Sequence, residues 1–137
     1  MAGAGAAGGL GFALMYYLNA ELESGVELIM RETKLEDEIK SADIVITGEG
    51  CLDSQTAMGK APIGIAVTAK KYGKPVIAFS GAVRNGAEVC NRQGIDAFFP
   101  ILRQVTTLEQ AMDKSCAYKN LADTAEQVFR TIKAFSE

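Results

Sequence analysis

The sequence predicts an α/β fold in which a parallel sheet carries helices on both faces. Its 137 residues, 48% hydrophobic and 23% charged, are typical of one globular domain with a sizeable core. Residues 43–48 contain the continuous β-branched run Ile44 to Ile46, and residues 75–80 contain a second apolar run, as in strands buried on both faces. Segments with helical periodicity separate these runs. Strands that alternate with helices favour a parallel sheet.

The first third of the chain is predicted to contain two helices and two strands. Residues 7–20 place Leu10, Leu14 and Leu18 at helical spacing. The short apolar run 26–30 is interpreted as a strand. Thr33 and Glu36 match a capping box that would open a helix ending near Ser41, and the buried strand 43–48 follows.

The same alternation continues to the end of the chain. Pro62 suits the first turn of a helix that would end at Gly73, before the strand 75–80. A helix over 86–93 ending at Gly94 precedes a strand over 96–101, whose proline indicates an edge or a strand end. Thr107 and Gln110 form a second capping box, opening a helix to about Ser115. The last predicted helix is apolar on one face, at Leu121, Ala125, Val128, Phe129 and Ile132.

The opening MAGAGAAGGLG contains Gly3, Gly5 and Gly8 at the dinucleotide-binding spacing G-x-G-x-x-G. That pattern needs a preceding strand, and the sequence supplies none before it. We therefore interpret the glycines as the entry to a helix, where unpaired backbone amides could still contact an anion.

Composition excludes several classes of function. A net charge of −3 argues against a nucleic-acid partner. No apolar run approaches the roughly 18 residues that span a bilayer. No membrane partner is expected, and because the start of the sequence lacks a basic signal segment, the protein is expected to be cytoplasmic. Histidine is absent and the three cysteines form no C-x-x-C pair, which removes histidine-based catalysis and the usual zinc sites.

The predicted loop 48–59, together with Lys60, is the leading site. It follows a buried strand, and ligands of parallel sheets bind at the carboxyl ends of strands. Lys60 would lie at a helix N-terminus that favours anions, and Glu49 and Asp53 offer hard oxygen ligands for Mg²⁺. Such groups suit phosphoryl transfer. The loop is not a Walker A motif, since Ser54 and Ala61 replace the required glycine and hydroxyl residue.

Three segments resemble the C-terminal part of bacterial type-1 glycerate kinases. They are GAGAAGGLG at 3–11, ITGEGCLDSQTAMGKAP at 46–62 and FSGAV at 79–83. The family pattern T-G-E-G-x-x-D-x-Q-T-x-x-G-K-x-P matches 47–62 without a break, although Cys51 stands where relatives often carry arginine. The resemblance implies transfer of phosphate from Mg·ATP to D-glycerate, on a Rossmann-like domain that carries an inserted second domain.

The resemblance also implies site residues. Asp53, Lys60 and Glu49 would be catalytic. Asp53 is the first choice, and Glu49 the second, for a metal ligand or for a base that orients the glycerate hydroxyl, and the two roles could be exchanged. Binding of substrate or phosphate would involve Thr47, Gly48, Gly50, Ser54, Gln55, Thr56, Gly59, Ser80 and Gly81. For the last two a second interpretation stays open, because a turn after a buried strand also needs small residues. Two interpretations stay open for Arg84 and Arg103, a pairing with the glycerate carboxylate and an ordinary surface position, of which the second is favoured. Cys90 and Cys116 are interpreted as packing residues, and Met58 as a loop anchor.

Family enzymes are much longer than this chain, so the resemblance implies a truncated portion. Residues 1–24 would lie at the junction with the inserted domain, and 25–137 would form the C-terminal half of the Rossmann-like domain. The alternatives are an inactive fragment that self-associates and a module that binds a small anion or nucleotide. The expected partners are D-glycerate and either a second copy or a missing N-terminal kinase segment.

Overall fold

A computed structural model describes residues 5–136. The chain divides into two compact units, one ending at Lys34 and the other beginning at Leu35. Each unit is described by itself. In the described residues, no helix has both the length and the apolar character needed to cross a membrane.

The first unit contains a 3₁₀ turn and two helices, Ala6–Gly9 (η1), Leu10–Leu18 (α1) and Gly25–Glu32 (α2). The turn before α1 is left-handed, with φ of 67° at Gly8 and 99° at Gly9, where glycine carries no steric penalty. These glycines therefore form the entry to a helix, as predicted, and no strand precedes them in the described residues. Gly3 lies outside those residues.

The predicted strand over 26–30 is wrong, because this segment is part of α2. A five-residue apolar run cannot distinguish a strand from a helix by periodicity alone. The flanking charges favour the helix, with Glu27 in its first turn and Arg31 in its last. Thr33 ends α2 by donating its hydroxyl hydrogen to the carbonyl of Ile29, so it does not open the next helix through a capping box.

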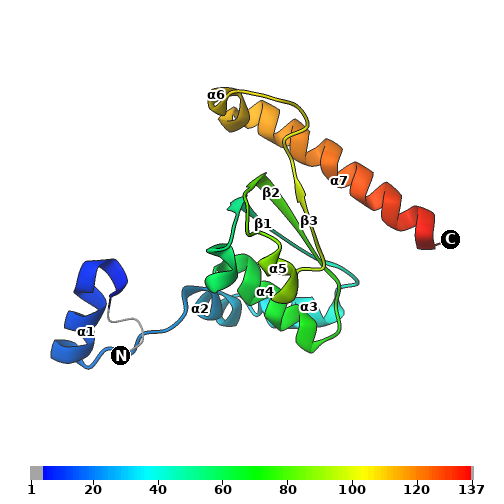
Figure 1. The fold of residues 1–137 in the computed structure, drawn as a ribbon. Helices are drawn as coiled ribbons and strands as arrows, with labels where there is room; N and C mark the ends of the chain where they lie inside the picture. The colour runs from blue at the N-terminus through cyan, green and yellow to red at the C-terminus, as the bar shows by residue number, and fades with distance from the viewer. Residues whose placement is uncertain (1–4, 137) are drawn as a thin grey trace. The chain divides into compact units, whose positions relative to one another are not determined.

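The second unit is built on a three-stranded parallel sheet (Figure 1). The strands are Val45–Leu52 (β1), Val76–Val83 (β2) and Ala97–Pro100 (β3), in the order β1-β2-β3. Val45 pairs with Val76, and Ile77 pairs with Ala97. The central strand β2 is buried over its first five residues, as expected for a strand covered on both faces.

Helices cover both faces of this sheet, as the sequence predicts. Ile39, Ile63 and Cys90 come from Leu35–Ser41 (α3), Ala61–Lys71 (α4) and Val89–Arg92 (α5), and they share one core with the sheet. On the opposite face Val128 of Lys114–Ser136 (α7) packs with Ile77 and Phe79. The remaining elements are Thr56–Met58 (η2) and Leu108–Met112 (α6), the latter opened by the predicted Thr107–Gln110 capping box.

Two boundaries differ from the prediction in a way that affects the site. β1 runs to Leu52 and β2 runs to Val83, so both strands extend past the glycines that suggested loops. The connection between β1 and α4 is consequently short, and it begins at Asp53. Gly48 and Gly50 therefore lie on a strand and not in a loop.

Candidate functional site

The end of β1 and the start of α4 bring an acidic and a basic side chain together. Glu49 lies on β1 and Lys60 is the residue immediately before α4. Their Oε1 and Nζ atoms are 3.4 Å apart, and the lysine side chain is 43% exposed against 27% for the glutamate. Two predicted site residues thus meet between the carboxyl half of a parallel strand and a helix N-terminus.

The second carboxylate oxygen of Glu49 is exceptional among the described residues. Oε2 is buried and has no hydrogen-bond partner in this part of the chain. Buried polar atoms are normally paired, so an orphaned carboxylate oxygen calls for a donor or a cation. A hard, anionic oxygen of this kind fits Mg²⁺, which is bound through one or two carboxylates and the substrate's phosphates.

Asp53 organises the turn that follows β1. Its Oδ1 accepts hydrogen bonds from the backbone N–H groups of Gln55 (2.9 Å) and Thr56 (3.0 Å) and lies 3.3 Å from the Thr56 hydroxyl. The hydrogen bond from the Thr56 amide is the largest cause that holds the pKa of Asp53 below its ordinary value. The charge of Lys60 and the Gln55 amide add to it, and together they outweigh desolvation, which raises the pKa. Asp53 is therefore a stably charged carboxylate.

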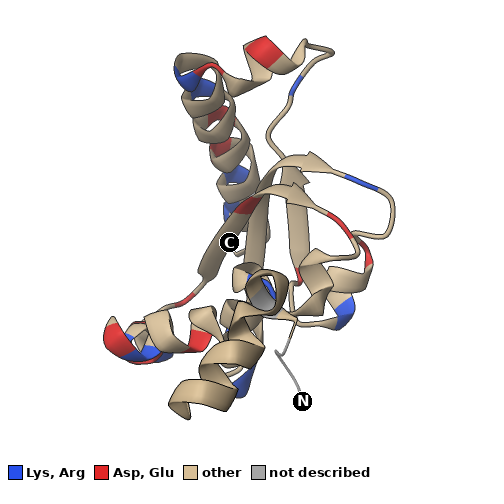
Figure 2. Ribbon diagram, turned by 90° about the vertical axis from the view of Figure 1, so that its left-hand side faces the viewer, with Lys and Arg blue, Asp and Glu red and all other residues tan. Residues whose placement is uncertain are grey.

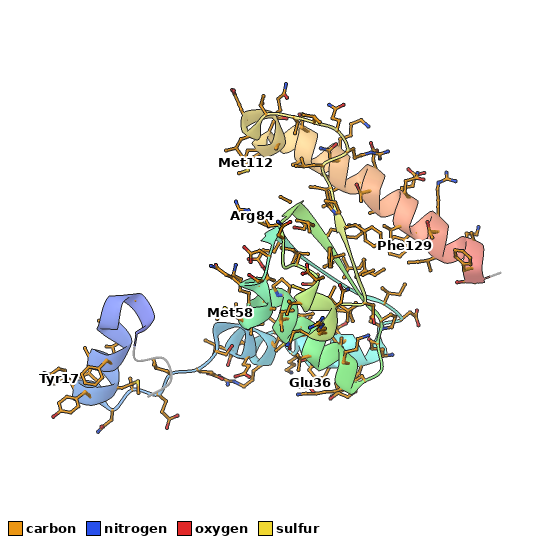
Figure 3. All side chains as sticks on the ribbon, in the orientation of Figure 1. Tyr17, Glu36, Met58, Arg84, Met112 and Phe129 are labelled. Atoms are coloured by element: carbon orange, nitrogen blue, oxygen red, sulfur yellow. The ribbon has the colours of Figure 1, made fainter. Side chains whose placement is uncertain are left out.

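The remaining polar residues of the segment divide into buried and exposed groups. Thr47 and Thr56 are buried, and Thr56 returns the interaction with Asp53 by accepting its backbone N–H at 3.3 Å. Ser54 and Gln55 are exposed on the turn. Met58 is 84% exposed (Figure 3), so its predicted role as a loop anchor is wrong for this structure.

Glycine occupies the different positions of the site for different physical reasons. A Cβ at Gly48 would lie 2.6 Å from the Phe79 carbonyl oxygen, and one at Gly81 would lie 2.6 Å from the Gly50 carbonyl oxygen. Both therefore permit close approach of β1 and β2. Gly59 has φ of 101°, which a side chain rarely adopts. A Cβ at Gly50 would meet nothing within 4 Å, so the described residues give no reason for glycine there.

Ser80 serves the sheet itself. Its buried hydroxyl accepts the backbone N–H of Leu52 at 3.1 Å and donates to the carbonyl of Ala82. Of the two interpretations left open for Ser80 and Gly81, these contacts favour packing between the strands. The sequence alone could not distinguish the two roles, because a small residue after a strand suits both ligand contact and packing between strands.

The segment after β2 braces the Asp53 turn, a role that sequence analysis missed. The Arg84 amide donates to the Leu52 carbonyl at 2.9 Å, and the Cys90 thiol lies 3.8 Å from the Asp53 carbonyl oxygen. Gly86, with φ of 88°, leaves room for Ser54, whose Cβ lies 3.0 Å from an added Cβ. The available sequence signal was the Asn85–Gly86 pair, which indicates a tight turn.

Cys90 is buried, which confirms its packing role, and burial raises the pKa of its thiol. The same prediction is wrong for Cys116, which is exposed. Arg84 and Arg103 are exposed, as predicted for surface residues. In the described part of the chain no group of three or more Asp, Glu, Cys or His side chains could hold a metal ion.

Comparison with known proteins gives a consistent result. Residues 1–133 match the model of the glycerate kinase family. Glycerate 2-kinase from Escherichia coli K12 is 45% identical over 130 residues, which cover 95% of this chain and 34% of that protein. A glycerate kinase from Halalkalibacterium halodurans is 49% identical over 112 residues, which cover 82% of this chain and 30% of that protein.

A solved structure supports the same relationship. The crystal structure of a candidate glycerate kinase 2 from Salmonella typhimurium LT2 superposes with a TM-score of 0.73 at 43% identity. The match covers 99% of this chain and 34% of that chain. The chain therefore spans about a third of the length of the relatives it matches.

Proposed function

Because the chain belongs to the glycerate kinase family, we propose that it forms part of an enzyme that transfers a phosphoryl group from Mg·ATP to D-glycerate. The product is a phosphoglycerate, and the location is cytoplasmic. The active enzyme would include residues corresponding to the rest of its relatives, either from a missing N-terminal kinase segment or from further copies. Residues 1–24 would lie at the junction with an inserted domain, and 25–137 would form half of a Rossmann-like domain.

The observation that carries this proposal is the Glu49–Lys60 pair with its orphaned carboxylate oxygen. Phosphoryl transfer requires positioning and charge stabilisation more than covalent chemistry. Lys60 and the adjacent backbone amides would stabilise negative charge on the transferring group. When bound, Mg²⁺ would supply charge neutralisation at the phosphates, and the carboxylates of Glu49 and Asp53 would hold it.

The pKa of Asp53 supports a choice between its two proposed roles. A general base works best with a pKa near the operating pH, and the pKa of Asp53 is shifted away from that range. Asp53 therefore suits a charged ligand that also shapes the turn. Thr47, Gly48, Thr56 and Gly59 would maintain the loop, while Ser54, Gln55 and the open position at Gly50 would face glycerate or nucleotide.

The decisive experiment measures ADP release from Mg·ATP in the presence of D-glycerate, with E. coli glycerate 2-kinase as the positive control. The 137-residue chain is tested directly, and Lys60→Met is tested in the chain and at the aligned position of that relative. Loss of one such charge-stabilising group lowers kcat by about 10²–10³-fold. Lys71→Met, at the other end of α4, is the matched control and retains full activity.

Two other functional classes give different results. An inactive fragment shows neither ADP release nor a Mg·ATP-dependent rise in melting temperature. An anion- or nucleotide-binding module shows the rise without turnover, because ligand binding stabilises the native state by mass action. Undiminished turnover of the Lys60→Met relative would remove Lys60 from the mechanism.

A further inference from the structure

A pocket with charged and amide side chains in its lining lies where the segment after β3 meets α6 and the first half of α7. Its volume is about 410 Å³, and its lining includes Arg103, Gln104, Gln110, Lys119, Asn120 and Asp123. None of these residues belongs to the Glu49–Lys60 site. The pocket is therefore a second place where the second unit could hold a ligand.

The charges of this pocket are unevenly balanced. Asp123 Oδ2 lies 2.7 Å from Lys119 Nζ and 3.4 Å from Arg103 Nη1, so two cations share one carboxylate oxygen. The Lys119 hydrogen bond, together with the positive charges of Lys119 and Arg103, holds the pKa of Asp123 below its usual value. These three side chains leave the lining with one net positive charge.

The neutral groups of the pocket add donors. Gln110 Oε1 accepts from the Thr106 hydroxyl at 2.8 Å and from the Thr107 amide at 3.2 Å, as part of the α6 capping box. The acceptor end of this amide is thereby engaged, and its Nε2 remains to donate to a ligand. Gln104 and Asn120 supply further amide groups. A cavity rich in donors and carrying net positive charge favours an anion.

We infer that this pocket binds a small oxyanion, with Arg103 and Lys119 as its cationic ligands and the Gln110 amide as a neutral donor. Arg103 offers the planar fork that matches carboxylate or phosphate oxygens, and Lys119 provides a point charge. The inference rests on Arg103, Gln110, Lys119 and Asp123 and is independent of the proposed kinase activity.

The test is a titration of the ¹⁵N-labelled chain with inorganic phosphate at millimolar concentrations, with ionic strength held constant by sodium chloride. We expect saturable shifts of the backbone amides of residues 103–106 and of the side-chain amides of Gln110 and Asn120. Shifts that fail to saturate, or that spread evenly over the chain, would overturn the inference. An equal titration with acetate distinguishes a carboxylate site from a phosphate site.

Three variants sharpen the test. Arg103→Gln and Lys119→Gln each remove a cationic ligand and should weaken phosphate binding at least several-fold, whereas Lys71→Gln, outside the pocket, leaves it unchanged. Asp123→Asn removes the competing carboxylate and should tighten binding by roughly two- to five-fold, the range expected for one charge near the surface. Equal effects of Lys71→Gln and Lys119→Gln would mean that phosphate responds to the overall positive charge of the chain and not to this pocket, which would overturn the inference.

Discussion

Gly50 and Gly81 are neighbours across β1 and β2, yet the space around them differs. Gly81 is confined by the Gly50 carbonyl, 2.6 Å from where its Cβ would be, while a Cβ at Gly50 would point into open space. The requirement for glycine at 81 thus comes from the sheet. At 50 the described residues impose no such requirement, which agrees with the proposal that a ligand approaches the backbone there.

Alanine at these two positions should separate stability from activity. Gly81→Ala forces β1 and β2 apart and should lower the free energy of unfolding by about 1–3 kcal/mol, as overpacking does. Gly50→Ala should change it by no more than about 0.5 kcal/mol, as at an unconstrained surface position. Urea denaturation of both variants measures this difference. At the aligned position of the full-length relative, Gly50→Ala should still lower kcat/KM, and full activity there would contradict a ligand contact.

At the scale of elements, α7 begins at a carboxylate that the chain uses as a cap. The Asp113 Oδ1 atom accepts hydrogen bonds from the Ser115 hydroxyl at 2.6 Å and the Cys116 amide at 2.9 Å. These interactions lower the pKa of Asp113 to about 2. The N-terminal end of α7 is therefore stabilised by a negative charge, which also complements the helix dipole.

This cap predicts a dependence of stability on acid. A lowered pKa stabilises the folded state at pH values above the unfolded pKa of about 3.9, and the contribution disappears as pH falls towards about 2. Asp113→Ala should therefore be less stable than the wild type at neutral pH, and the difference should shrink below pH about 4. Thermal unfolding between neutral and acidic pH measures it. Asp43→Ala, at an exposed aspartate before β1, is the control.

The helices and strands that the sequence predicted well either begin and end at characteristic residues or contain long apolar runs. Pro62 and Gly73 bound α4, and the apolar run at 75–80 lies in the central strand, because buried parallel strands need no alternation. The apolar run at 26–30 is too short for its spacing of apolar residues to distinguish a helix from a strand. The lengths of β1 and β2 could not be predicted, because glycines that allow close strand pairing look like loop residues in a sequence.

The sequence predicted which polar residues form the candidate site, but it predicted only some of the contacts between them. The motif residues Glu49 and Lys60 do meet. Ser80 holds its neighbouring strand, and the bracing contact of Gly86 with Ser54 was not expected. Contacts between segments some thirty residues apart depend on strand register, which sequence patterns do not specify.

At the scale of the whole molecule, β1 is an edge strand of the three-stranded sheet. Ile46 on this strand is 49% exposed, although its partner Ile77 on β2 is buried. An open edge with an exposed apolar side chain favours pairing with another chain. By contrast, β3 at the other edge is short and ends at Pro100, features that discourage such pairing.

We therefore expect the isolated chain to self-associate in a concentration-dependent manner. Ile46→Lys, which places a charge on the open edge, should shift the population towards monomer. Sedimentation velocity over a range of concentrations measures this. Val105→Lys, at a fully exposed position away from the sheet, is the control. An equal shift with Val105→Lys would mean that added charge alone, and not the β1 edge, controls association.

The sequential strand order has a consequence for the order in which the chain can be assembled during synthesis. Each strand pairs with the next one along the chain, and α3, α4 and α5, which cover one face, all precede β3 (Figure 1). Figure 2 shows the strands almost entirely in tan, because they carry few charged residues. Within the described residues of the second unit, the other face, with Ile77 and Phe79, packs against α7, which follows all three strands along the chain. A ribosome-bound chain that ends before α7 therefore exposes this apolar face, a state in which chaperones would be expected to bind it.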